Sequence, residues 1–322
     1  MKTRKLGNSG LEVSPLMFGG NVFGWTLDEA ASFKLLDAYV GAGFNFIDTA
    51  DVYSKWAPGN KGGESETIIG NWFKRSGKRR DVILATKVGV EMGPDKKGLS
   101  RSYIFQAVED SLQRLRTDYI DLYQSHRDDT ETPQEETMEA FAQLIREGKV
   151  RAIGASNITA ERLESALQVS RQHGWPRYES LQPHYNLYER ADYEAKLESV
   201  CLENNLGVIP YYSLASGFLS GKYRSEEDLK KSARGQGVKK YLNDRGLKIL
   251  AALDEVAKQN HSTPAAVALA WLMARPGITA PIASATSLEQ LKDLIAATTL
   301  ELNQSSIDLL NQASAPLAAR AK

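Results

Sequence analysis

The 322-residue chain is poor in several features that mark particular classes of protein. Its single cysteine, Cys201, cannot form an internal disulfide, which fits the reducing cytoplasm where we expect the protein to be located. Basic and acidic residues number 40 each, so no net charge favours nucleic acid or a membrane surface as a partner. No apolar run approaches the about 18 residues of a membrane span, and residues 1–7 lack the apolar core of a signal peptide.

Two further absences narrow the chemistry and the fold. His173, His184 and His261 do not show the spacing of metal ligands, and there is no Cys/His cluster, so we expect no catalytic metal. A doubly wound nucleotide-binding sheet would carry a Gly-x-Gly-x-x-Gly turn after its first strand. The sequence has no such turn, which counts against that fold.

What the sequence does contain is a regular alternation of short apolar runs and amphipathic stretches. A turn signal at 7–10 predicts an opening hairpin of 4–6 with 11–13. Strands are then predicted at 16–18, 44–48, 82–87, 119–125, 150–154, 179–182, 208–211 and 278–282. Helices are predicted at 28–42, 64–75, 100–115, 133–147, 159–172, 192–205, 244–259, 264–275 and 288–297.

Eight strand-plus-helix units in one chain predict an α/β fold, a (β/α)8 TIM barrel, with the hairpin and extra helices added to it. We expect residues 1–322 to form this one domain. A long irregular segment at 213–238, rich in glycine, serine and lysine, is of a length that usually serves function. A tail ending Ala315-Pro316-Leu317-Ala318 closes the chain.

Four chemically distinctive side chains stand at or just beyond predicted strand ends. Asp48 ends one strand and Tyr53 follows on the next loop, while Lys87 and His126 end two further strands. Barrels hold their active sites at this edge. We expect Lys87, held by Asp48, to lower the pKa of the Tyr53 phenol, so that Tyr53 donates a proton to a carbonyl oxygen that His126 orients. Any one of the four alone would more often be structural, but the set of four is specific.

The motifs around these residues resemble those of a known family. Phe46-Ile47-Asp48-Thr49-Ala50-x-x-Tyr53, Ala85-Thr86-Lys87 and Asp121-Leu122-Tyr123-Gln124-x-His126 are similar to the signature segments of the aldo-keto reductases, in the branch of bacterial general aldo/keto reductases and potassium-channel β subunits. The resemblance covers nearly the whole chain. It implies an NADPH-dependent oxidoreductase in which Asp48, Tyr53, Lys87 and His126 form the catalytic tetrad.

The resemblance also implies a set of cofactor-binding positions. Ser156, Asn157 and Gln182 would bond the nicotinamide carboxamide, and Tyr211 would stack on its ring. The sequence Tyr212-Ser213-Leu214 departs from the family's usual Ser-Pro-Leu and leaves the pyrophosphate contacts open. The remaining expected cofactor positions are Gly20, Asn21, Val22, Leu214, Ser216, Gly217, Lys222, Arg234, Ser284, Thr286 and Gln290.

Cofactor and substrate preference depend on fewer residues. Relatives often supply a lysine and an arginine for the 2′-phosphate near the last barrel helix, where this chain has Ser284, Thr286 and Gln290, with Asp293 one turn on. Arg234 is the expected substitute, and NADPH is therefore expected ahead of NADH. The substrate is expected to be a small-molecule carbonyl. The loop aromatics Trp25, Trp56, Tyr185 and Tyr212 are candidates to line its pocket.

Two other functions remain open at this point. A regulatory or redox-sensing subunit would bind the cofactor with little turnover, although a histidine at position 126 counts against it. An unrelated barrel enzyme that forms a Schiff base on Lys87 would leave Ser156, Asn157 and Tyr211 without a role. The sequence leaves the physiological substrate, the direction of reaction and the oligomeric state, monomer or homo-oligomer, undecided.

Overall fold

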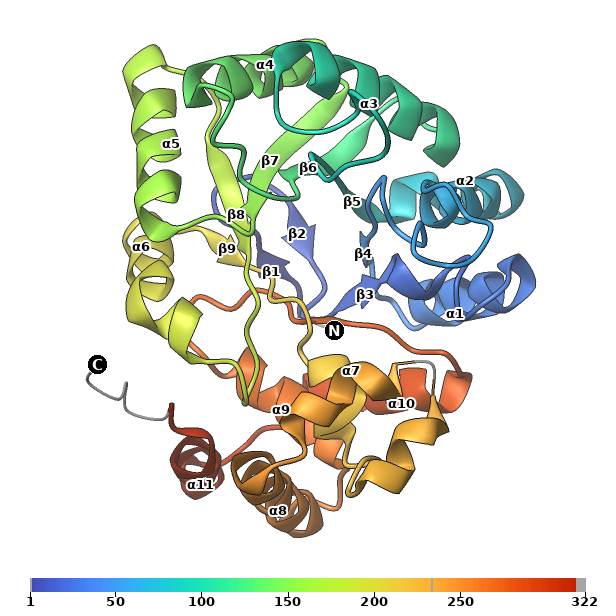
Figure 1. Ribbon diagram of the computed structural model, residues 1–322, viewed down its shortest axis with the longest axis vertical. Helices are drawn as coiled ribbons and strands as arrows, with labels where there is room; N and C mark the ends of the chain where they lie inside the picture. Colours follow the sequence, from blue (N-terminus) through green and yellow to red (C-terminus); the bar gives the residue numbers. More distant parts are fainter. Residues whose placement is uncertain (1, 233, 317–322) are drawn as a thin grey trace.

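Eight parallel strands form a single sheet that curls into a barrel, with helices around it (Figure 1). The computed structural model describes residues 2–232 and 234–316, so Leu317 and Ala318 of the predicted tail lie outside the described residues. The strand order is β10-β3-β4-β5-β6-β7-β8-β9. The strands are β3 (Met17–Gly19), β4 (Phe46–Asp48), β5 (Ile83–Val88), β6 (Ile120–Ser125), β7 (Val150–Ser156), β8 (Tyr178–Gln182), β9 (Gly207–Val208) and β10 (Ile282–Ala283). The predicted (β/α)8 barrel is confirmed.

The seam between β9 and β10 shows why two predicted strands are shorter than expected. Residues 278–280 pair with β9, through a parallel bridge between Ile278 and Val208 and a bond from the Thr279 N–H to the Val208 carbonyl. The chain then crosses to β3, where Met17 donates to the Pro281 carbonyl. Pro210 and Pro281 have no N–H to donate, so a regular ladder cannot continue through either residue.

Helices follow the strands and cover the outside of the barrel (Figure 1). Side-chain caps mark several of their first turns: Asp28, Ser100 and Thr159 each accept from the backbone N–H three residues on. The α-helices are α1 (Glu29–Gly41), α2 (Glu64–Ser76), α3 (Arg101–Leu115), α4 (Gln134–Arg146), α5 (Ala160–His173), α6 (Glu198–Glu203), α7 (Gly235–Val238), α8 (Asp244–Gln259), α9 (Pro264–Met273), α10 (Leu288–Ala296) and α11 (Gln304–Ser314). A π-helical turn, η3 (Tyr193–Leu197), precedes α6 and replaces the first part of the predicted helix at 192–205.

The opening hairpin fills the amino-terminal end of the barrel. Its strands, β1 (Arg4–Lys5) and β2 (Glu12–Val13), pair antiparallel, as predicted. Leu6, Leu11 and Val13 are buried in one cluster with apolar side chains from inside the barrel. A Cβ on Gly207 would lie only 2.6 Å from the Leu6 side chain, so the hairpin packs directly against β9. The open end of the barrel is therefore the carboxyl end of the strands.

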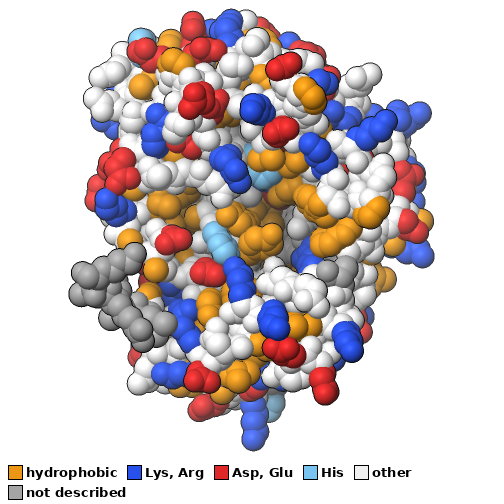
Figure 2. Space-filling view, viewed as in Figure 1, with side chains coloured by type: hydrophobic (Ala, Val, Ile, Leu, Met, Phe, Trp, Pro, Cys, Tyr) orange, Lys and Arg blue, Asp and Glu red, His pale blue; other side chains and the backbone are white. Residues whose placement is uncertain are grey.

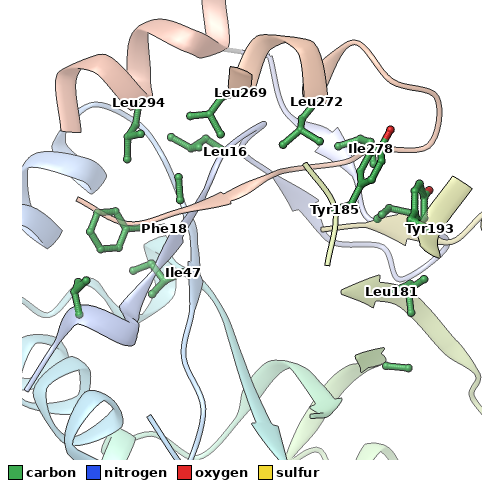
Figure 3. Close-up of a cluster of buried hydrophobic side chains, with 14 of the residues drawn as sticks. Leu16, Phe18, Ile47, Leu181, Tyr185, Tyr193, Leu269, Leu272, Ile278 and Leu294 are labelled. Carbon is green, nitrogen blue, oxygen red and sulfur yellow. The ribbon is translucent and has the colours of Figure 1, made fainter. Parts of the chain in front are cut away.

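A second and larger core lies between the barrel and its helices (Figure 3). In the region drawn, Leu269 and Leu294 point from α9 and α10 toward the strand layer that carries Leu16 and Phe18. These side chains have at most 3% of their surface exposed. Burial of this kind contributes roughly 1.5–3 kcal/mol for each large side chain.

Two regions differ from the sequence-based expectations. The segment 213–238 is not simply irregular, because it contains the 3₁₀ turns η4 (Ala215–Ser220) and η5 (Glu226–Lys231) and the whole of the short helix α7. Helix α11 lies beyond 288–297, which we expected to be the last helix. Among the described residues, no helix combines the length and apolarity needed to cross a membrane.

Candidate active site

A cleft of about 1300 Å³ opens at the carboxyl ends of the strands. Figure 2 shows a hollow in the middle of this face, with hydrophobic, basic and histidine side chains around it. Asp48 comes from the end of β4, Lys87 from β5, and Gln182 from the end of β8. Tyr53 and His126 stand on the loops after β4 and β6 and line the cleft with Asp48. The barrel therefore brings the four predicted catalytic side chains together.

A buried ion pair organises this group. The Lys87 ammonium lies 2.7 Å from Asp48 Oδ1, and both side chains are 0–1% exposed. Lys87 Nζ also donates to the Thr49 carbonyl and to the Tyr53 hydroxyl, each at 2.8 Å. The Tyr53 hydroxyl in turn donates to Asp48 Oδ2 at 3.0 Å. Each proton of the ammonium has an acceptor, as a buried charge requires.

The expected effect on Tyr53 is wrong in one respect. We expected Lys87 to lower the pKa of the phenol, but burial and the negative charge of Asp48 raise the pKa of Tyr53 well above its usual value. Burial also lowers the pKa of Lys87, against the opposing influence of Asp48. Tyr53 is therefore a protonated donor at neutral pH, and Lys87 is placed to stabilise the phenolate only after the proton has left.

His126 faces Tyr53 with the edge of its ring, at a centroid separation of 5.8 Å. Burial, followed by the charges of Lys87 and Arg127, lowers the pKa of His126 well below its usual value. The imidazole is consequently neutral at neutral pH. Its Nδ1 is buried and has no hydrogen-bond partner among the described residues. A neutral ring beside the phenol can donate a hydrogen bond to a carbonyl oxygen without carrying charge.

Three of the predicted carboxamide-binding residues meet at the ends of β7 and β8. Ser156 donates to the Gln182 carbonyl at 2.8 Å, and the Gln182 amide donates to Asp48 Oδ1 at 3.0 Å. Asn157 donates to the His126 carbonyl and accepts from the Tyr211 hydroxyl, both at 2.8 Å. A carboxamide bound here would compete with Tyr211 for the Asn157 oxygen.

The segment after β9 forms a second wall of the cleft. Ser216 and Gly217 both have positive φ, 58° and 95°, which turns the backbone sharply at this wall. A Cβ on Gly217 would meet the Lys222 side chain at 3.2 Å, so glycine at this position leaves room for the lysine. Leu214, Ser216, Gly217 and Lys222 all line the cleft.

Arg234 lies on the same wall and has no ion-pair partner among the described residues. Its guanidinium lies over the Trp25 ring at 5.3 Å, and burial lowers its pKa. Its Nη2 atom is buried and finds no acceptor among the described residues, and no carboxylate there pairs with it. A partly buried cation with an unbonded nitrogen is costly, and an anionic ligand would relieve that cost.

The segments after β3 and β10 carry small polar groups that also line the cleft. Ser284 donates to the Asn21 side chain at 2.7 Å, and the Gln290 side chain accepts from the N–H and hydroxyl of Thr286. These four residues and Val22 line the cleft. Gly20 does not line it; Gly19 lines it instead. A Cβ on Gly20 would lie 2.8 Å from the Asp48 carbonyl, so this glycine lets the chain pass close to β4.

The aromatic lining matches expectation at three positions and not at a fourth. Trp25 and Trp56 pack edge to face at 5.6 Å, and both line the cleft with Tyr212. The expectation for Tyr185 is wrong. Its ring is fully buried against Trp271 in the layer between barrel and helices (Figure 3), because its hydroxyl bonds Glu194 at 2.7 Å, away from the cleft.

Three residues at or near the site were not anticipated. Arg127, next to His126, lines the cleft. His184 stacks on Tyr211 with ring centroids 5.2 Å apart. Asp51 lies between Asp48 and Tyr53 in sequence but faces a separate cavity of about 220 Å³. The positions of Arg127 and Asp51 beside catalytic motifs were a usable signal, whereas nothing in the sequence marks the contact of His184.

Comparison with known proteins agrees with this geometry. Residues 15–315 match the model of the aldo/keto reductase family. The uncharacterized oxidoreductase YrpG of Bacillus subtilis (strain 168) is 36% identical over 319 residues, which are 97% of this chain and 95% of that protein. The aldo-keto reductase AFTS1 of Alternaria alternata is 35% identical, over 93% of this chain and 88% of its own. Protein tas of Escherichia coli (strain K12) is 32% identical, over 94% and 95%.

A (β/α)8 barrel that matches this family model along most of its length belongs to the oxidoreductases that act on carbonyls. The chain belongs to the aldo/keto reductase family, which generally uses nicotinamide cofactors. The family resemblance seen in the sequence is confirmed.

Proposed function

We propose that this protein reduces aldehydes or ketones to alcohols with NADPH as the hydride source and Tyr53 as the proton donor. The observation that supports this most directly is the Tyr53 hydroxyl, which lies 2.8 Å from the Lys87 ammonium and 3.0 Å from Asp48 at the floor of the cleft. In this proposal Asp48, Tyr53, Lys87 and His126 are the catalytic residues. Residues 1–322 would act as one domain.

Each of the four side chains then has a distinct task. Tyr53 transfers its hydroxyl proton to the carbonyl oxygen, and Lys87 stabilises the phenolate that remains. Asp48 holds Lys87 in place and keeps it charged. His126, which is neutral, orients the carbonyl by a hydrogen bond. A reduced nicotinamide, when bound, supplies the hydride to the carbonyl carbon.

The cleft has the features that a phosphorylated dinucleotide requires. Tyr211 offers a flat ring beside Asn157, and Lys222 and Arg234 provide cations on the wall after β9. Neither cation forms an ion pair with any described carboxylate, so both are free to bind phosphate. This supports assigning the expected cofactor positions, other than Gly20, to direct contact.

The test of the reaction is Tyr53→Phe, assayed for NADPH oxidation against a panel of aldehydes, ketones and keto-sugars. We expect kcat to fall by 10²- to 10⁴-fold because the proton donor is lost, while the Kd for NADPH changes little. A variant that keeps more than about a tenth of kcat would contradict the role of Tyr53. If the unmodified protein binds NADPH tightly but turns over no member of the panel, the result favours the alternative of a regulatory subunit.

The test of the cofactor is Arg234→Ala, with the Kd of NADPH and NADH measured side by side. We expect a roughly 10- to 100-fold loss for NADPH and a much smaller loss for NADH, because charge-assisted bonds to the 2′-phosphate disappear. Lys230→Ala, an exposed lysine of the same segment, serves as the control. Equal losses for the two cofactors would mean that Arg234 does not contact the 2′-phosphate.

A further inference from the structure

Arg127 is a cation at the cleft that neither the tetrad nor the cofactor positions account for. It follows His126 directly and is exposed on the cleft wall. Burial lowers the pKa of His126, and the charge of Arg127 adds to this, whereas burial raises the pKa of Tyr211 and the charge of Arg127 acts against that rise. Arg127 lines the same cleft as Tyr53 and Tyr211 and is next in sequence to His126, the residue that would orient the carbonyl.

The acids next to Arg127 in sequence do not neutralise it. Asp128 is bound by Arg162, whose Nε and Nη2 donate to its two oxygens at 2.8 and 3.0 Å. Asp129 accepts from Leu99 N at 2.8 Å and Thr132 Oγ1 at 2.7 Å. In the part of the chain that the structure describes, no carboxylate lies within ion-pair distance of Arg127. The Arg127 guanidinium on the loop after β6 is therefore not neutralised by a neighbouring acid.

Aromatic side chains line the part of the cleft next to Tyr53. Trp56 is 6.0 Å from the Tyr53 ring and 49% exposed, and Tyr212 is 48% exposed. These are two of the five large hydrophobic side chains that are exposed among the described residues. Trp25 braces Trp56 edge to face, and Val52 and Val90 add aliphatic surface. Exposed aromatic groups gathered at a cleft are typical of a binding surface for a flat apolar body.

We propose that the carbonyl substrate is an aromatic aldehyde or ketone that bears a carboxylate, with Arg127 binding the carboxylate and Trp25, Trp56 and Tyr212 enclosing the ring. This rests on the proposed reductase function and specifies its substrate class. The planar guanidinium can form two parallel bonds to a carboxylate, which fixes both position and orientation. Lys222 and Arg234 lie on a different wall, so phosphate binding does not require Arg127.

The experiment compares two para-substituted benzaldehydes that differ in one charge, 4-formylbenzoate and its neutral methyl ester. We expect a higher kcat/KM for the acid, and Arg127→Gln should reduce it roughly 10- to 100-fold while changing the ester less than about threefold. Arg127→Lys should recover part of the loss, because charge returns without the planar fork. Arg146→Gln, an exposed arginine on α4 away from the cleft, should alter neither substrate.

Several results would overturn the assignment. An unmodified protein that reduces the ester as efficiently as the acid would refute the carboxylate preference and leave the reductase function standing. Equal losses on both substrates in Arg127→Gln, or a matching rise in the Kd for NADPH, would place Arg127 in general catalysis or cofactor binding instead. Failure to reduce any carbonyl would refute both proposals.

Discussion

Asp51 is the residue whose environment is hardest to reconcile with an ionised side chain. It is 1% exposed, and neither carboxylate oxygen has a hydrogen-bond partner among the described residues. Burial, and then the charge of Glu66, raises the pKa of Asp51 well above its usual value. The Arg114 guanidinium near this cavity is already bound to Glu66 at 2.7 Å. The folded protein therefore favours the protonated acid at this position.

This makes the contribution of Asp51 to stability depend on pH. Above about pH 4 the unfolded chain releases the proton while the folded state keeps it, so stability falls as pH rises toward the raised pKa. Asp51→Asn replaces the acid with a side chain that does not titrate, so this pH dependence of stability disappears. We expect its free energy of unfolding, relative to the unmodified protein, to increase with pH by up to about 1.4 kcal/mol per unit in that window.

Denaturant titrations at pH 5 and pH 8 measure the difference, with the exposed Asp118→Asn as control. A difference that is the same at both pH values would show that Asp51 is ionised in the folded state.

The identity of the candidate catalytic residues could be predicted from the sequence, but the pKa of Tyr53 could not. The strand ends and motifs identified Asp48, Tyr53 and Lys87, but the pKa of Tyr53 depends on burial and on the distance to Asp48, which only the folded chain defines.

At the scale of elements, the short opening hairpin should contribute strongly to the stability of the fold. Leu6 is fully buried at the end of the barrel, between β1 and β9. We expect Leu6→Ala to lower the free energy of unfolding by roughly 2–5 kcal/mol, since the cavity cannot collapse against the strand ends. Denaturant unfolding measures it. Leu247→Ala, at a side chain 43% exposed on α8, should cost far less, and similar losses would contradict the packing role.

Elements were predictable where a pattern was long and its caps were clear. Asp28, Ser100 and Thr159 marked helix starts correctly because their side chains satisfy free backbone N–H groups. The short turns within 213–238 have no periodicity, since their conformation depends on contacts with other segments. Helix α11 was not predicted, although Asn303 caps its first turn, and its mostly polar sequence offers few apolar positions to mark a helix.

At the scale of the whole molecule, positive and negative charges are equal in number but unevenly distributed. Net charge is zero, yet Arg127, Lys222 and Arg234 line the cleft without ion-pair partners among the described residues. We expect the Kd for NADPH to rise severalfold between about 0.1 M and 1 M salt, because the screening length shortens from about 10 Å to 3 Å. Lys222→Met should weaken binding and also flatten this dependence. A Kd unaffected by salt would contradict an electrostatic role for the cleft.

Because the amino-terminal end of the barrel is filled, small molecules can reach the cleft only from the other end. Leu6, Leu11 and Val13 block the amino-terminal end, so in the proposed reaction the cofactor and the carbonyl compound both enter through the opening at the carboxyl ends of the strands. In that reaction the release of the product or of the cofactor through this opening, rather than the proton transfer from Tyr53, can limit the rate of the cycle.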